Sequence, residues 1–116
     1  MRSKNPAVRR KALLVFGRKS FPVLKKFLME DSSEVIRHEA AFLLGASKNK
    51  KAPKILINAI VNDKSNLVRH EAIEALGDIG FKDKQVLSLL SALVRDKERF
   101  IVDTAKIALK TLEISK

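Results

Sequence analysis

The chain contains the segment Val35-Ile36-Arg37-His38-Glu39-Ala40, and the similar segment Leu67-Val68-Arg69-His70-Glu71-Ala72 follows 32 residues later. Both histidines of the chain lie in these segments, and a glutamate follows each of them. A fixed period of about 20 to 50 residues is typical of stacked helical repeats. The sequence therefore predicts a repeat protein whose chemistry is concentrated at four side chains, namely His38, Glu39, His70 and Glu71.

Apolar residues recur at helical spacing along almost the whole chain, and nowhere do they alternate long enough to indicate a strand. We expect an all-α domain over residues 1–116, an α-α superhelix of about seven helices. Asp31 is placed to cap the third helix, with Glu34 reaching back as in a capping box. We expect this helix to end at Gly45 in a left-handed C-cap, and the fifth helix to end at Gly77.

The composition limits the compartment and the chemistry. The chain has no cysteine, so a disulfide framework, a thiol nucleophile and a thiolate metal site are excluded. This suits a reducing compartment, and we expect a cytoplasmic protein. No apolar run approaches the roughly 20 residues that cross a bilayer, so we expect no membrane association.

The charge balance favours anionic partners, because 24 lysines and arginines face 13 aspartates and glutamates, a net charge of +11. Such a field attracts nucleic acid or an acidic protein. Nucleic acid is the less favoured partner, since the chain has no Trp or Tyr to stack on bases and no known nucleic-acid motif. Most of the charge is explained as lysine-rich faces that keep a small helical protein in solution.

Four alanines mark one repeated unit: Ala12, Ala40, Ala72 and Ala105 are separated by 28, 32 and 33 residues. The pattern Asp-x-x-x-x-[Val/Ile]-Arg-x-x-Ala, after a helix with proline near its start, resembles HEAT repeats. The resemblance implies that the Val-Arg helices line a concave face and that aspartates and arginines form a ladder between repeats. The matching residues, which we therefore assign to structure, are Asp31, Asp63, Arg37 and Arg69.

The helical wheel places the first glutamate at the edge of an apolar stripe. Ile36, Ala40 and Leu43 share this stripe, and Glu39 lies between Val35 and Leu43. A carboxylate bordered by apolar side chains loses solvation and needs a cation or several hydrogen-bond donors. The partner would be an arginine of a neighbouring repeat if Glu39 is structural, or a metal if it is functional.

The two His-Glu pairs can meet, because neighbouring helices pack about 8–10 Å apart. Imidazole nitrogens and carboxylate oxygens without sulfur suit iron or manganese in oxygen chemistry, or zinc. The spacing alone also allows a bland explanation, in which tandem duplication copied an ordinary exposed His-Glu pair.

Tandem His-Glu pairs on consecutive HEAT-like helices resemble the deoxyhypusine hydroxylases, which are HEAT-repeat di-iron monooxygenases. A half of such an enzyme has four repeats, with His-Glu in the two inner ones. Here the inner pairs are present, and the outer positions read Arg10-Lys11 and Asp103-Thr104. The resemblance implies a di-iron cofactor. It also implies iron ligands or substrate-binding carboxylates at four positions, with Glu39 and Glu71 as the catalytic candidates: His38, Glu39, His70 and Glu71.

By the same resemblance the enzyme would hydroxylate the deoxyhypusine side chain of translation initiation factor 5A. The family uses four His-Glu pairs and this chain supplies two, so we expect a homodimer. The last helix supports this expectation, because we expect it to be apolar nearly all round from Phe100 to Ile114, whereas a terminal repeat in water should have a polar outer face. The alternative is a non-catalytic HEAT module that binds a protein, since phycobilisome-lyase-like HEAT proteins also carry Val-Arg-x-x-Ala helices. The positive charge is also awkward for a cationic substrate.

Overall fold

The computed structural model describes residues 3–80 and 82–114. Within these residues the chain is helical and has no strand, as the apolar periodicity predicts. A short 3-10 helix, η1 (Gly17–Lys19), follows the first of seven α-helices, and none of these helices is long and apolar enough to cross a membrane. Their bounds are α1 (Pro6–Phe16), α2 (Phe21–Glu30), α3 (Glu34–Ala46), α4 (Ala52–Asn62), α5 (Asn66–Ile79), α6 (Lys84–Leu93) and α7 (Arg99–Ile114).

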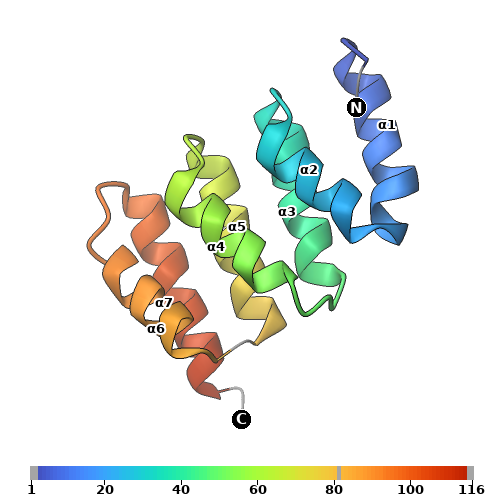
Figure 1. Cartoon of the computed structure of the whole chain (residues 1–116). Coiled ribbons are helices and arrows are strands. Elements are labelled where there is room, and N and C mark those ends of the chain that lie inside the picture. Colours follow the sequence, from blue (N-terminus) through green and yellow to red (C-terminus); the bar gives the residue numbers. More distant parts are fainter. Residues whose placement is uncertain (1–2, 81, 115–116) are drawn as a thin grey trace.

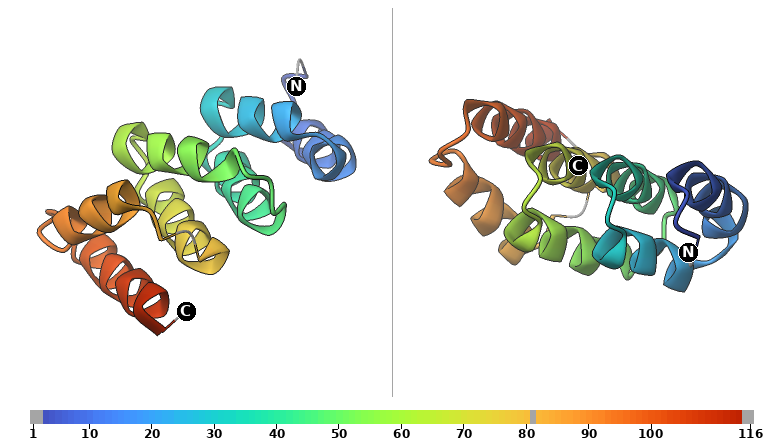
Figure 2. Two further views of the ribbon diagram at one scale, coloured as in Figure 1. Left: turned by 60° about the horizontal axis from the view of Figure 1, so that its bottom comes forward. Right: turned by 90° about the horizontal axis from the view of Figure 1, so that it is seen from above.

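The helices stack in two layers. Helices α1, α3, α5 and α7 lie side by side in one layer, and α2, α4 and α6 form the other (Figures 1 and 2). Successive helices run in opposite directions, so the connections alternate between two edges of the molecule (Figure 1). Both His-Glu pairs therefore lie in the same layer, on the adjacent helices α3 and α5.

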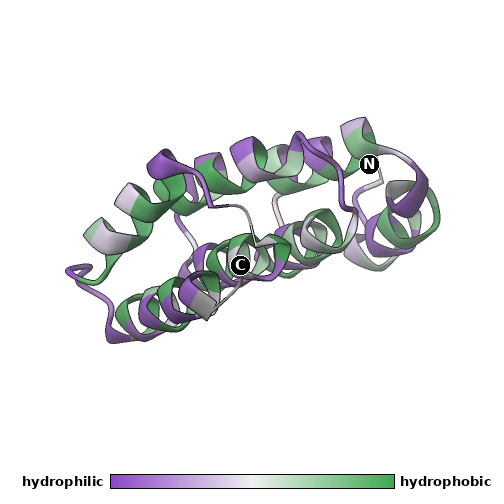
Figure 3. Ribbon diagram, turned by 90° about the horizontal axis from the view of Figure 1, so that it is seen from below, coloured by the Kyte–Doolittle hydropathy of each residue, from purple (hydrophilic) through white to green (hydrophobic). Residues whose placement is uncertain are grey.

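The core lies between the two layers. Helix α3 buries Ile36, Ala40, Ala41 and Leu44, and the other helices contribute residues such as Phe27. Apolar and polar residues are mixed along the helices of both layers (Figure 3). Because the apolar residues recur at helical spacing, they form a stripe along one side of each helix. Full burial of one large apolar side chain stabilises the fold by about 1.5–3 kcal/mol.

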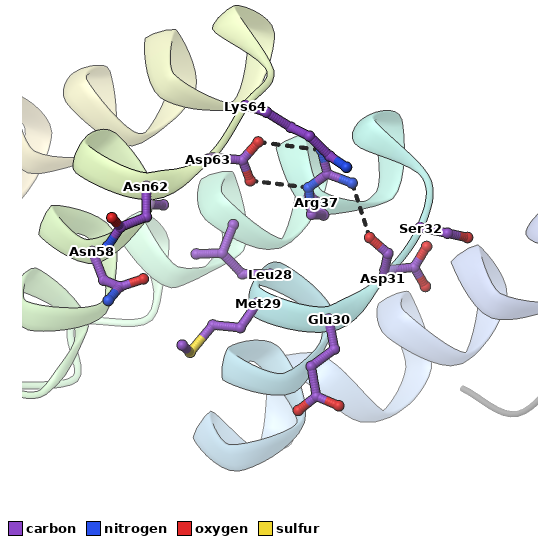
Figure 4. Close-up of a pocket in the computed structure, with 11 residues that line it drawn as sticks. Leu28, Met29, Glu30, Asp31, Ser32, Arg37, Asn58, Asn62, Asp63 and Lys64 are labelled. Carbon is purple, nitrogen blue, oxygen red and sulfur yellow. Dashed lines mark hydrogen bonds and ion pairs between the residues drawn. The ribbon is translucent and has the colours of Figure 1, made fainter.

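Arginines of one repeat bind aspartates of the next, as the HEAT resemblance implies. Arg37 holds Asp63 through two bonds of 2.9 and 3.2 Å, and it also donates to the carbonyl oxygen of Asp31 (Figure 4). Arg9 binds Asp31 in the same way, and Arg69 donates to Asp96. Sequence reasoning assigned only part of this ladder, because it left out Arg9 and Asp96.

The predicted capping box is wrong. The N-cap of α3 is Ser33, whose hydroxyl accepts from the Ile36 amide. Asp31 is held by Arg9 and accepts from the Ser33 amide, while Glu34 accepts from the Ser65 hydroxyl at 2.6 Å. Each of the two carboxylates therefore contacts a residue of a neighbouring repeat instead of forming a capping box.

Two predicted helix ends are also wrong. Helix α3 continues past Gly45 to Ala46, and its C-cap residue is not left-handed. Helix α5 continues past Gly77 to Ile79 and ends at Gly80, whose φ of 73° is the left-handed conformation that glycine adopts without strain.

The outer side of α7 is not apolar all round, which removes the premise of the expected dimer contact. Four of its apolar residues are buried in the core, namely Ile101, Ala105, Ala108 and Leu112. Its exposed positions include charged residues as well as Phe100 and Ile107. The helix is amphipathic, as expected for the last helix of a repeat array. The side chain of Ile114 lies outside the described residues.

Gly45 and Gly77 give a matched pair of variants. A Cβ at Gly45 would lie 2.7 Å from the Ala75 Cβ and 3.2 Å from its Cα, whereas at Gly77 it would lie 3.4 Å from the Ala108 Cβ. Gly45→Ala should therefore force α3 and α5 apart at a cost of about 1–3 kcal/mol, more than its gain in helix propensity. Gly77→Ala should be neutral or stabilise by up to about 1 kcal/mol. Urea unfolding measures both, and equal effects would contradict the close helix contact.

Candidate metal centre

A second set of contacts joins the repeats on the face of α1, α3, α5 and α7 that is turned away from the other layer. We call this face the open face. Each contact joins two neighbouring helices. When the repeats are aligned, the residue on the second helix lies one position after the equivalent of the residue on the first. The three contacts are Arg10–Glu39, His38–Glu71 and His70–Thr104. The same diagonal thus links α1 to α3, α3 to α5 and α5 to α7.

The central contact of this set joins the two His-Glu segments. His38 Nε2 lies 2.8 Å from Glu71 Oε1, and only 14% of the Glu71 side chain is exposed. Burial raises the pKa of the Glu71 carboxyl, with His38 opposing the rise and Glu74 adding to it. Burial therefore makes the charged form of Glu71 more costly than in water, and a nearby cation offsets this cost.

His70 is held on both sides of its ring. Its Nδ1 lies 2.6 Å from the Thr104 hydroxyl, which itself donates to the carbonyl oxygen of Phe100. Because the hydroxyl hydrogen is used there, Thr104 accepts from an Nδ1–H group. The other ring nitrogen, Nε2, contacts the Glu74 carboxylate. The Phe100 ring stacks on the imidazole at a centroid distance of 4.2 Å.

Glu39 contacts Arg10 rather than the histidines. This is the structural alternative that the sequence left open, in which an arginine of a neighbouring repeat satisfies the carboxylate. The wheel placed the core stripe too close to Glu39, since Val35 is 53% exposed and Leu43 only partly buried. Arg10 is itself exposed, and Glu39 raises the pKa of its guanidinium.

Two comparisons with known proteins agree with the repeat fold, whereas a search of curated proteins gave no match. The sequence profile of HEAT repeats matches residues 21–110. The chain belongs to the HEAT-repeat family. The structure of human deoxyhypusine hydroxylase in complex with glycerol superposes with a TM-score of 0.72 at 26% sequence identity. That match covers 97% of this chain and 45% of the human enzyme, so this HEAT-repeat chain spans less than half the length of its relative.

The side chains of this HEAT-repeat face fit a divalent metal in their chemistry and in one of their contacts. Ligands bound at about 2.0–2.2 Å lie roughly 3 Å apart when they subtend a right angle at the metal, close to the 2.8 Å between His38 Nε2 and Glu71 Oε1. A third donor, His70 Nε2, is turned to Glu74. Consequently the described residues contain no group of three ligands that is already gathered around a metal position.

Sequence reasoning missed two residues of this site, Thr104 and Phe100. Thr104 directly precedes Ala105, as Glu39 precedes Ala40 and Glu71 precedes Ala72, so the alanine alignment puts it at the glutamate position of the last repeat. That signal was read only as the absence of a His-Glu pair. Phe100 lies one helical turn before Thr104 and carried no separate signal.

The raised pKa of Glu71 predicts how stability depends on pH. A carboxyl whose pKa is higher in the folded state binds its proton more tightly there, so its contribution falls as pH rises from its ordinary value of 4.5 through the folded value. Glu71→Gln should remove this contribution, and the loss of stability between pH 4.5 and neutrality should be smaller than in the wild type. Thermal unfolding of the metal-free proteins across that range measures it, and parallel curves would contradict the expected shift.

Proposed function

We propose that the chain is an iron-binding HEAT module that forms a homodimer and acts as a monooxygenase of the deoxyhypusine hydroxylase type. The contact between His38 of one repeat and Glu71 of the next carries this proposal. It joins an imidazole to a largely buried carboxylate whose charge a cation would stabilise, and His70 is the adjacent residue of α5. The fold-level match to human deoxyhypusine hydroxylase supports the proposal independently.

The positions of the side chains suggest separate tasks. His38, His70 and Glu71 would hold the iron, which supplies oxygen activation when it is bound. Thr104 would fix the His70 proton on Nδ1, so that Nε2 could bind the metal in place of its contact with Glu74. Glu39, which lies toward α1 with Arg10, would instead bind the cationic end of a substrate amine.

A second copy would cover the open face and supply the other two His-Glu pairs. Phe42 lies one turn from His38 and is 57% exposed, and Ile107 lies beside His70 in a cavity of about 190 Å³ and is also exposed. Burying such side chains yields about 25 cal/mol per Å² of apolar area. Light scattering at tens of micromolar should give twice the chain mass, and a monomer mass in the presence of iron would end the two-copy proposal.

The activity itself is tested with iron-loaded protein in air. The substrate is translation initiation factor 5A that carries deoxyhypusine, and mass spectrometry should detect the gain of one oxygen atom in it. We expect the reaction to take place in the cytoplasm. His70→Ala is the inactive control. If the wild type retains iron and forms no product, the proposed substrate is wrong while the metal site stands.

A second candidate function is a non-catalytic module that binds a protein through the open face. The observation in its favour is that Glu39 and His70 already have protein partners, Arg10 and Thr104. In that case the open-face contacts are structural, and the exposed Val35, Phe42 and Ile107 would be the contact residues. Failure of the protein to bind iron at all would leave this function in place of the first.

A further inference from the structure

One edge of the molecule carries an excess of exposed cations. We define the basic edge as residues 17–19, 47–54 and 82–84, which form η1, two connections and the starts of α4 and α6. It contains eight cations and a single acid, Asp83. Within the described residues none of these cations takes part in an ion pair; they are Arg18, Lys19, Lys48, Lys50, Lys51, Lys54, Lys82 and Lys84. Figure 3 looks onto this edge and shows hydrophilic connections there.

The opposite edge has a different character. It holds the connections α2–α3, α4–α5 and α6–α7 (Figure 1), where Asp31, Asp63 and Asp96 are bound by the arginine ladder. The α2–α3 connection carries Asp31 as its only charged residue, and the other two connections carry charges of both signs. The fold therefore separates a neutralised edge from one whose charge is left for solvent or a ligand.

The fold itself does not explain several lysines of the basic edge. Lys48 has a φ of 58°, a left-handed conformation that glycine or asparagine adopts more easily. Lys51 is the N-cap of α4 and makes no side-chain capping bond. Lys54 and Lys84 lie in the first turns of α4 and α6, where the helix dipole disfavours a positive charge. These positions cost stability, and an anionic ligand would gain from the charge that they present.

We propose that the basic edge binds the phosphate backbone of double-stranded DNA, a role beyond the chemistry of the open face. Lysine is a compact point charge suited to phosphates, and neutralising them releases counterions. The edge runs along the stacking direction of a molecule 40 Å long, which corresponds to about 12 base pairs at about 3.4 Å each. Several cations can therefore contact one duplex at the same time.

The side chains of the edge favour a DNA duplex over other nucleic acids. Single-stranded binding relies on several aromatic platforms, whereas among the described residues one exposed aromatic side chain, Phe16, directly adjoins the basic edge. Recognition of double-stranded RNA relies on contacts to 2′-hydroxyl groups. The one hydroxyl of the basic edge, that of Ser47, already donates to the Leu44 carbonyl.

The test is fluorescence anisotropy of the full chain with a labelled 20-base-pair DNA duplex at salt concentrations from 50 to 200 mM. Lys48→Gln/Lys51→Gln should weaken binding by about 10-fold or more at 100 mM salt, and it should reduce the slope of log K against log salt by about 1.8, or about 0.9 for each phosphate that is no longer neutralised. The control Lys64→Gln/Lys97→Gln removes the same charge from the exposed opposite edge and should leave both quantities unchanged.

A further variant separates binding from folding. Lys48→Asn removes one cation of the basic edge and places asparagine at the left-handed position (φ 58°), so it should keep or raise the Tm while it weakens DNA binding. A fall in Tm would show that Lys48 serves the fold, and equal weakening in the two double variants would show that only total charge matters. The proposal is overturned by either result, by absence of duplex binding at 50 mM salt, or by tighter binding of single strands or RNA duplex. Binding of polyglutamate alone would overturn it in favour of an acidic protein.

Discussion

Replacing Arg37 with alanine should lower the free energy of unfolding by about 3–5 kcal/mol, one of the two largest effects expected in this chain. The Arg37 side chain is 10% exposed, and its guanidinium satisfies both carboxylate oxygens of Asp63 together with the Asp31 carbonyl. Without it, Asp63 is left as a charge with 8% exposure and no compensating cation. The same change removes the ion pair that joins α3 to the start of the next repeat.

Urea unfolding of wild type and Arg37→Ala measures this effect. The matched control is Arg99→Ala, which removes the arginine of an exposed pair with Asp103 within α7. Exposed pairs of this kind contribute little to stability, so the control should unfold close to the wild type. If both variants lose equally little, the ladder is not what ties the repeats together.

The second large effect concerns iron retention. His38→Ala and His70→Ala should each weaken iron binding by at least about 100-fold. Loss of a residue that only hydrogen-bonds to a metal ligand already costs about 10–100-fold in affinity, and loss of the ligand itself should cost more. Each change removes one imidazole and leaves Glu71 with a single nearby histidine. The measurement is the iron content after anaerobic loading and desalting, with the fold checked by circular dichroism.

Two further variants give this experiment its specificity. Thr104→Val removes the acceptor of the His70 Nδ1–H and should weaken iron binding by about 10-fold or more without removing a ligand. Asp103→Asn changes a neighbouring exposed side chain and should retain iron as the wild type does. Retention of iron by both histidine variants would mean that the metal is held elsewhere.

Much of the fold could be predicted from local sequence because helices follow from apolar periodicity. The errors lie where a side chain had a choice of partner. Asp31 and Glu34 have capping spacing, yet each binds a residue outside the cap, Arg9 and Ser65 respectively. Gly45 has the composition of a helix end, but it is required by the close approach of Ala75. Which partner such a side chain binds depends on how neighbouring helices are offset along their axes. The local sequence pattern does not predict that offset.

The candidate site shows the same limit. The sequence identified both His-Glu pairs and placed them on adjacent helices of one layer. It could not predict that His38 contacts Glu71 of the next repeat, or that Glu39 contacts Arg10 of the previous one. Those pairings follow from the diagonal offset between neighbouring helices. The two glutamates, which are equivalent in sequence, are therefore in different electrostatic surroundings.

The central claim, that the two His-Glu segments form one metal site, is tested most directly by the imidazole NMR signals of untagged protein during titration with Zn²⁺, a diamagnetic substitute for iron. The chain has only two histidines, His38 and His70, so each ring gives a separately assignable signal. We predict that the Nε2 signals of both rings shift together and stop shifting at one equivalent of metal. If neither ring responds, or if only one does, the claim is contradicted.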